Sequence, residues 1–162
     1  MNGILEERPT LARRRGTNPV VNRIVVAIDL SEHSRKTIAY AAALAKHFGA
    51  SLTLVHAFEP EPFTFTTPQV HESYEMARRD AQLTLLRLVD EVRETYPNCE
   101  MEFRIGEPAE QIALMVLNLN ADLVITASHS PNFLARLFRA GEAIRILRSV
   151  CCPVLVYHEG NE

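Results

Sequence analysis

The segment Leu123-Val124-Ile125-Thr126-Ala127-Ser128-His129-Ser130 joins a short apolar run to a polar loop. An apolar run without alternation is typical of a strand that is buried on both faces of a parallel sheet. Residues 141–149 then show a helical pattern, and residues 154–157 are again strand-like. A loop that follows a parallel strand is where nucleotide phosphates bind. The segment therefore predicts the position of a nucleotide site, although the loop at 127–133 contains no glycine.

The same alternation of strand and helix continues toward the N-terminus. Strands are predicted at residues 24–28, 52–55, 101–105, 123–126 and 154–157. Helices are predicted at residues 31–48, 69–96, 108–119 and 141–149. Five strands and four helices in strict alternation predict an α/β fold: a five-stranded, doubly wound parallel sheet with helices on both faces, in three layers.

The first three predicted helices each carry an apolar stripe that we expect to be buried against the sheet, and in the fourth we expect the same of Ile144, Ile146 and Leu147. The stripes are Ile38, Ala41, Ala42 and Ala45; Leu83, Leu86, Val89 and Val92; and Ile112, Met115, Val116 and Leu119. Gly49 stands at the end of the first helix, where a left-handed residue is expected. Residues 59–68 contain three prolines and predict a long surface loop.

Length, composition and charge bound the class of protein. With 162 residues, the chain is long enough for one domain with a sizeable core. Its net charge of −3, with basic residues spread along the chain, argues against nucleic acid as the main partner. No apolar run reaches membrane-spanning length, and residues 1–22 lack the apolar core of a signal peptide. We therefore expect a cytoplasmic protein with no membrane partner.

Cysteine and histidine give no sign of a disulfide framework or a metal site. The three cysteines are an odd number, and the six histidines show no ligand spacing with them. No nucleophile is paired by spacing with His129, so we predict no catalytic residue and no enzyme. Residues 1–22, with the basic triplet Arg13-Arg14-Arg15, are predicted to be a flexible extension. The domain spans residues 23–158, and residues 159–162 form a tail.

Five short segments resemble the universal stress protein family, in its order and spacing. They are Val25-Val26-Ala27-Ile28-Asp29-Leu30-Ser31; Gly49-Ala50-Ser51-Leu52-Thr53-Leu54-Val55-His56; Gly106-Glu107-Pro108-Ala109; Asn120-Ala121-Asp122-Leu123-Val124-Ile125; and Cys152-Pro153-Val154-Leu155-Val156. The resemblance implies the strand order 3-2-1-4-5. It also implies a homodimer that pairs through the last strand. Many members of the family bind ATP or a related adenine nucleotide, and others do not.

Members that bind ATP carry a loop of the form G-x-x-G, nine residues, then G-S or G-T. Placed on this chain by the resemblance, the three glycines fall at Ala127, Ser130 and Ala140, and the hydroxyl residue falls at Gly141. Glycine lets backbone N–H groups approach phosphate oxygens, and proline has no N–H to offer. The replacements, together with Pro131, predict weak or absent ATP binding.

The resemblance outlines a candidate nucleotide cleft at the carboxyl ends of the central strands. Its residues are Ala27, Asp29, Val55, Thr126, Ala127, Ser128, Ser130, Ala140 and Gly141. In binding members the acid that matches Asp29 lies near the adenine and the ribose. Asp29 and Ser31 equally suit a turn or a cap at the start of a helix.

Two functions of different classes fit these residues. The first is a homodimeric stress-response protein that acts through unknown protein partners, has a degenerate ATP-binding loop and needs no cofactor. The alternative is a sensor that binds an adenine nucleotide (AMP, ADP, ATP or a cyclic nucleotide) through the altered loop. Binding of ATP or AMP discriminates between them.

Overall fold

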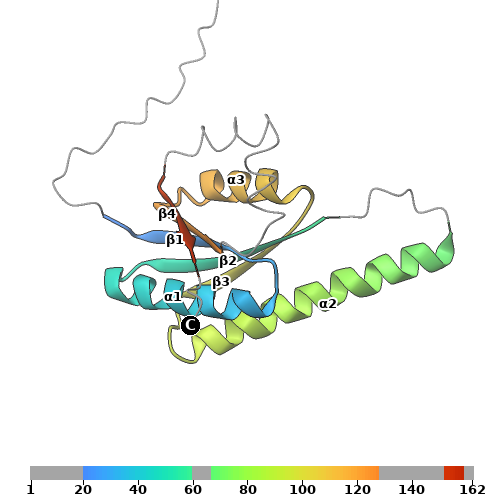
Figure 1. The fold of residues 1–162 in the computed structure, drawn as a ribbon, viewed down its shortest axis with the longest axis horizontal. Coiled ribbons are helices and arrows are strands. Elements are labelled where there is room, and N and C mark those ends of the chain that lie inside the picture. The colour runs from blue at the N-terminus through green and yellow to red at the C-terminus, as the bar shows by residue number, and fades with distance from the viewer. Residues whose placement is uncertain (1–19, 60–66, 128–151, 159–162) are drawn as a thin grey trace, which may run out of the picture.

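The fold is a five-stranded parallel sheet in the order β3-β2-β1-β4-β5, as predicted (Figure 1). The computed structural model describes residues 20–59, 67–127 and 152–158. The strands are β1 (Arg23–Ala27), β2 (Ser51–Phe58), β3 (Cys99–Ile105), β4 (Leu123–Ala127) and β5 (Val154–Tyr157). The helices are α1 (Glu32–Phe48), α2 (Pro68–Arg93) and α3 (Pro108–Asn118).

Helices cover both faces of the sheet, so the described part of the chain has the predicted three layers. In Figure 1, α1 and α2 lie on one side of the sheet and α3 lies on the other. Three helices are described. The fourth helix predicted at 141–149 lies outside the described residues, as do the proposed extension and most of the loop after β4.

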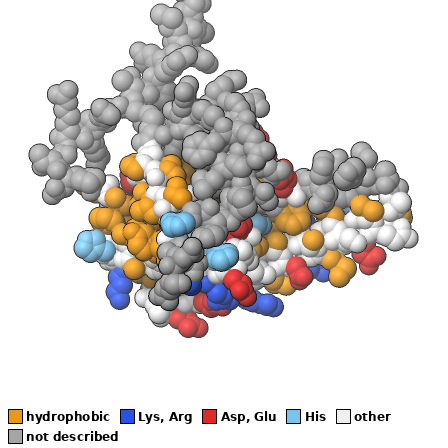
Figure 2. Space-filling model, in the orientation of Figure 1, with side chains coloured by type: hydrophobic (Ala, Val, Ile, Leu, Met, Phe, Trp, Pro, Cys, Tyr) orange, Lys and Arg blue, Asp and Glu red, His pale blue; other side chains and the backbone are white. Residues whose placement is uncertain are grey.

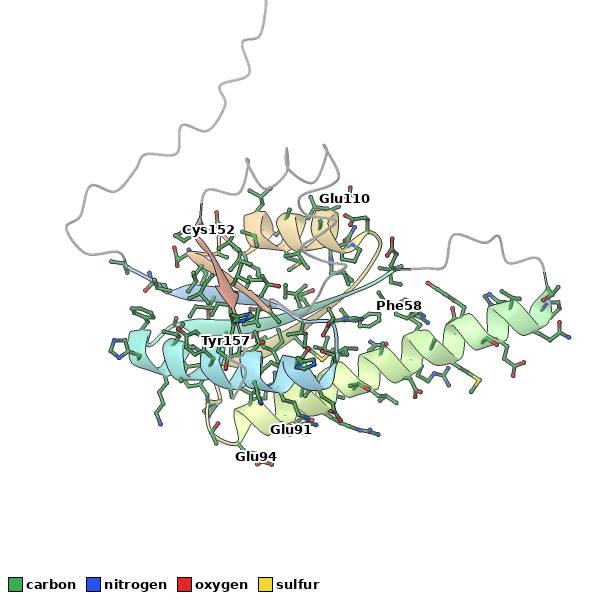
Figure 3. All side chains as sticks on the ribbon, in the orientation of Figure 1. Phe58, Glu91, Glu94, Glu110, Cys152 and Tyr157 are labelled. Carbon is green, nitrogen blue, oxygen red and sulfur yellow. The ribbon has the colours of Figure 1, made fainter. Side chains whose placement is uncertain are left out.

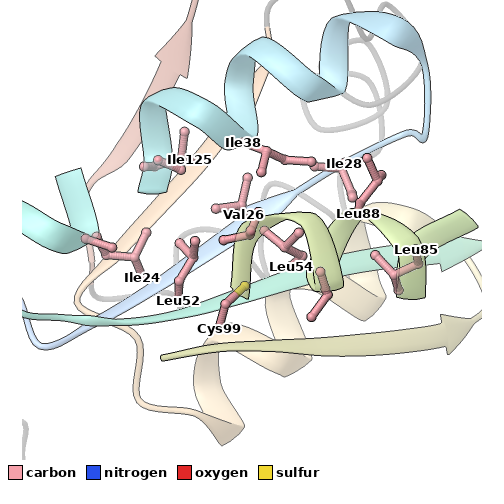
Figure 4. Packing of buried hydrophobic residues seen from close by; sticks show 14 of the residues in the cluster. Ile24, Val26, Ile28, Ile38, Leu52, Leu54, Leu85, Leu88, Cys99 and Ile125 are labelled. Atoms are coloured by element: carbon pink, nitrogen blue, oxygen red, sulfur yellow. The ribbon is translucent and has the colours of Figure 1, made fainter. Parts of the chain in front are cut away.

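Two apolar clusters hold the layers together. The larger joins the α1 and α2 face of the sheet and includes Val26, Leu54, Leu85 and Ile125, each fully buried (Figure 4). The smaller joins the α3 face and includes Val25, Val55 and Val124 together with Ile112 and Met115. Alternate residues of β1 therefore enter opposite clusters, as side-chain alternation along a strand requires.

The inner face of α2 differs from the predicted one. Leu83 and Leu86 are 44% and 40% exposed, whereas Leu85 and Leu88 are buried beside Val89 and Val92. The residues 85, 88, 89 and 92 form a complete i, i+3, i+4, i+7 series, and the predicted set does not. The prediction for Leu83 and Leu86 was wrong because leucines at four nearby positions offer two overlapping stripes.

The start of α2 was also placed too late. Pro68 is the first residue of α2, at a position where its missing N–H costs nothing. Thr67 is the N-cap, and its hydroxyl accepts a hydrogen bond from the N–H of Val70 at 3.4 Å. The helix is long, and in Figure 1 its first half extends beyond the edge of the sheet.

Other predicted details are confirmed. Gly49 follows α1 with a φ of 66°, in the left-handed region, and Pro108 is the first residue of α3. The strand predicted at residues 101–105 is part of β3, an edge strand on which Met101 and Phe103 are half-buried.

A single carboxylate fastens the first strand to the fourth. The carboxylate of Asp122 accepts hydrogen bonds from the N–H groups of Asn22 and Arg23, at 2.9 and 3.0 Å. The N–H of Asp122 donates in return to the carbonyl of Arg23 at 2.8 Å. These contacts set the amino ends of β1 and β4 side by side, and so they also align the carboxyl ends that carry the candidate site.

Candidate functional site

Four of the predicted site residues meet at the carboxyl edge of the sheet. Ala27 at the end of β1 pairs with Val55 of β2 on one side and with Thr126 of β4 on the other. All three side chains are buried, and Ala127 ends β4 beside them. The strand order causes this meeting, because it places β1 between β2 and β4.

Asp29 lies just beyond this row and organises the turn that leads into α1. Its Oδ1 accepts hydrogen bonds from the N–H of Ser31 at 3.0 Å and from the Ser31 hydroxyl at 2.6 Å. The hydroxyl of Ser34, which is buried, donates to the same oxygen at 2.8 Å. The turn role that the sequence suggested for Asp29 is therefore observed.

The turn holds Leu30 in a conformation that leucine rarely adopts. The φ of Leu30 is 62°, in the left-handed region. A residue in this conformation costs on the order of 1–3 kcal/mol and persists only where its surroundings fix it. Here the three hydrogen bonds to Asp29 fix it, so the carboxylate holds a strained turn at the edge of the cleft.

The hydrogen bonds also keep Asp29 ionised. Partial burial alone would raise the pKa of Asp29, but the donors of Ser31 and Ser34 outweigh it and the pKa lies below its usual value. Within the described residues, every hydrogen bond to this carboxylate reaches Oδ1. Oδ2 therefore remains as an acceptor for a ligand hydroxyl or amine.

His56 is a polar residue at this edge that the sequence analysis did not select. It follows Val55 on β2, and its Nδ1 lies 2.9 Å from the carbonyl oxygen of Ile28. Because a carbonyl only accepts, Nδ1 carries the proton. Burial lowers the pKa of His56, although the hydrogen bond to Ile28 opposes this effect. A single ionisable residue within an otherwise uncharged strand was the signal that could have revealed it.

An aromatic row runs from His56 away from the cleft toward α2. The rings of His56 and Phe103 have centroids 5.8 Å apart, and Phe103 stacks on Phe58 at 6.1 Å. Phe58 then meets Tyr74 of α2 edge to face at 5.5 Å. Figure 3 labels Phe58 at this position, where β2 reaches α2. The row packs the first third of α2 against the end of β2 and places an aromatic ring beside His56.

The remaining predicted site residues belong to the loop after β4 and to the segment that follows it. Ser128, Ser130, Ala140 and Gly141 lie outside the described residues, as does Pro131.

The described residues contain no metal site, and the thiol of Cys99 is held in its protonated form. No group of three His, Cys, Asp or Glu side chains that could hold a metal ion is found in residues 20–59, 67–127 and 152–158. Cys99 is a buried free thiol, and burial raises its pKa to about 11. None of the described helices is long and apolar enough to cross a membrane.

Comparisons with known proteins agree on one family. The model of the universal stress protein family matches residues 21–158. A universal stress protein from Thermus aquaticus, encoded in the QAH/OAS sulfhydrylase 3′ region, is 29% identical over 82% of this chain and 96% of its own length. Among solved structures, a universal stress protein in complex with cAMP has a TM-score of 0.62 and 17% identity, over 87% of this chain and 99% of that one. A family member from Arabidopsis thaliana with AMP bound has a TM-score of 0.56 and 13% identity, over 86% and 92% of the two chains.

Proposed function

This chain belongs to the universal stress protein family, and on that premise we propose that it binds an adenine nucleotide with a single phosphate group and does not depend on ATP. The observation that carries the proposal is the contrast between the two ends of the candidate cleft. The nucleoside end keeps an ionised acceptor and a small buried floor, whereas the phosphate end has lost its glycines. The protein would bind this ligand without converting it chemically. Its proposed location is the cytoplasm.

The nucleoside end is supported by the row of Ala27, Val55 and Thr126 and by Asp29. The row is buried, two of its three side chains are apolar, and the side chain of Ala27 is small. Among the described residues the Ser31 and Ser34 donors to Asp29 reach Oδ1, and Oδ2 suits a sugar hydroxyl, which would donate to it. The donors of Ser31 and Ser34 fix the orientation of the Asp29 carboxylate before a ligand binds. Binding therefore does not have to order this side chain.

The phosphate end is where the chain departs from members that bind ATP. Ala127 stands where the first loop glycine would be, and its side chain is buried at the end of β4. A Cβ at that position hinders the close approach of a phosphate to the backbone. A single phosphate group needs fewer backbone N–H donors than the three phosphates of ATP. The site therefore favours AMP or a cyclic nucleotide over ATP. The family members in complex with cAMP and with AMP support this choice.

A thermal-shift titration with AMP, cAMP, ADP and ATP tests the proposal. A ligand at a hundred times its Kd adds about 2.7 kcal/mol of stability, so millimolar nucleotide reveals even a Kd of tens of micromolar. AMP or cAMP should raise the Tm, and ATP should not. Asp29→Asn should abolish the shift, whereas Asp80→Asn on the exposed side of α2 should leave it unchanged. Saturable ATP binding at micromolar concentration would refute the proposal.

A second candidate is a homodimer that acts through protein contacts without any nucleotide. It is favoured by the contrast between the two edge strands. On β3, Glu100, Glu102 and Arg104 place charges along the edge, which is how proteins prevent strand pairing. On β5, the sequence Val154–Tyr157 has no charge, and Val154 and Val156 are 41% and 45% exposed. The β5 edge therefore suits pairing with a second copy.

Light scattering on matched edge variants tests this second candidate. Val156→Glu should convert a dimer into a monomer, because it places a charge on the β5 edge. Ile105→Glu is the control, since Ile105 is 47% exposed on the opposite edge strand. A protein that is monomeric at micromolar concentration, or a dimer that only Ile105→Glu disrupts, contradicts pairing through β5.

A further inference from the structure

A groove of about 400 Å³ lies between α1 and α2, away from the carboxyl edge of the sheet. Its floor is apolar: Ala39, Ala42 and Ala43 line it from α1, and Leu88 and Val92 line it from α2. The groove exists because α1 presents alanines where larger side chains would fill the space between the helices. Its volume lies within the range of about 300–1,000 Å³ that is usual for binding sites.

The two ends of the groove differ in charge. At one end, the guanidinium of Arg35 forms a bidentate ion pair with the carboxylate of Glu91, with Nη2 and Oε1 3.2 Å apart. At the other end stands Lys46, eleven residues and therefore about 16 Å farther along α1. Among the described residues no ion pair to Lys46 is found. This end of the groove therefore offers one unbalanced positive charge to an acidic group.

The chain enters the domain beside the Lys46 end. The hydroxyl of Tyr96, which lines the groove, donates to the carbonyl of Ala50 at 2.5 Å. The next residue, Ser51, donates from its N–H to the carbonyl of Asn22 at 2.8 Å. Figure 1 shows the start of β1 on the same side of the molecule as the end of α1, and in Figure 2 acidic and basic side chains gather where α1 and α2 lie. Asn22, near the start of the described chain, therefore lies close to the Lys46 end of the groove.

One segment of residues 1–19 has the chemistry that the groove requires. Ile4-Leu5-Glu6-Glu7 joins two large apolar side chains to two acids, whereas Leu11 is followed closely by the basic triplet Arg13-Arg14-Arg15. The family match begins at residue 21, so this segment is outside the family domain. Residues 8–19 span up to roughly 40 Å when extended, which exceeds the length of the groove.

We propose that Ile4-Leu5-Glu6-Glu7 docks in the groove between α1 and α2 of its own chain. Ile4 and Leu5 pack on the alanine floor, and the two acids pair with Lys46. A short tether gives an effective concentration in the millimolar range. An intrinsic Kd of about 1 mM is therefore enough to fill roughly half of the grooves. Docking of this kind would cover an apolar surface that other proteins could otherwise contact.

A single tryptophan reports on the proposed docking, because the natural chain has none. In Leu5→Trp, the fluorescence should lie at shorter wavelength and be quenched less by acrylamide than in a free peptide of residues 1–19 with the same change. Adding Lys46→Glu or Ala39→Glu should return both values to those of the free peptide. Ala39 is exposed on a helix, so the added glutamate should leave the fold intact, and circular dichroism checks this.

The matched control and the rescue make the test specific. Arg87→Glu is the matched control, because like Lys46→Glu it reverses one positive charge. Arg87 lies on α2, is exposed and does not line the groove, so the tryptophan fluorescence should not change. Combining Lys46→Glu with Glu6→Lys and Glu7→Lys should restore the protection. The proposal is overturned if the tryptophan of Leu5→Trp has the emission wavelength and the acrylamide quenching of a fully exposed tryptophan. It is also overturned if Arg87→Glu changes these values as much as Lys46→Glu does. Protection that disappears on dilution shows that a second copy receives the segment and also overturns it.

Discussion

Leu85 and Leu83 give a direct test of how α2 packs on the sheet. They stand two positions apart on one helix, yet Leu85 is fully buried in the larger cluster and Leu83 is 44% exposed. Removing a buried leucine side chain costs about 2–5 kcal/mol, because the lost burial and the remaining cavity add together. We expect Leu85→Ala to lower the free energy of unfolding by about 3 kcal/mol. Leu83→Ala should change it by no more than about 0.5 kcal/mol.

Thermal unfolding followed by circular dichroism measures the difference. For a domain of this size, 1 kcal/mol shifts the Tm by roughly 2–4 °C, so Leu85→Ala should lower it by roughly 6–12 °C. Helix propensity contributes little, since both substitutions replace leucine with alanine in a helix. Equal Tm shifts for the two variants, or a larger shift for Leu83→Ala, would refute the observed orientation of α2.

Three further predictions concern the edge of the cleft and one turn. Burial lowers the pKa of His56, so the unfolded chain binds a proton at this residue more readily than the folded chain does. The free energy of unfolding, measured by urea titration, should therefore fall as the pH drops below about 6.5. His56→Phe should make the free energy of unfolding less dependent on pH in this range. Ser34→Ala should cost about 1 kcal/mol at neutral pH. Because the pKa of Asp29 is lowered on folding, that cost should disappear as acid titrates through its folded-state value. Gly106→Ala should cost about 1–3 kcal/mol in the same assay, since φ is 139° and the new Cβ would lie 2.9 Å from Nε2 of Gln111; a neutral outcome would show that this turn relaxes.

The sheet could be predicted from the sequence because its strands are continuous apolar runs. Val25 and Val26 face opposite clusters, so burial on both faces leaves no polar residue in β1 after Arg23. β2 was predicted too short, at residues 52–55, because His56 looked like the end of the run. In the structure β2 continues to Phe58, and the carbonyl of Ile28 satisfies the buried Nδ1 of His56.

The candidate site could be predicted only in part. The family resemblance located Ala27, Val55 and Thr126, and the strand register brings them into one row. The hydrogen bond from Ser34 to Asp29 was not predicted, since it depends on the left-handed turn at Leu30. Sequence patterns report periodicity along one element, whereas this contact depends on the path between two elements.

The hydrogen bonds from Asn22 and Arg23 to Asp122 have a consequence for the folding of the chain. The two partners of the Asn22 hydrogen bond are 100 residues apart in sequence. β1 can pair with β2 soon after synthesis, but its other edge stays open until β4 has left the ribosome. Contacts between such distant segments form slowly, and open strand edges invite aggregation in the meantime. We therefore expect the sheet of the first three strands to stay incomplete until β4, which follows Asp122, and then β5 have been synthesised.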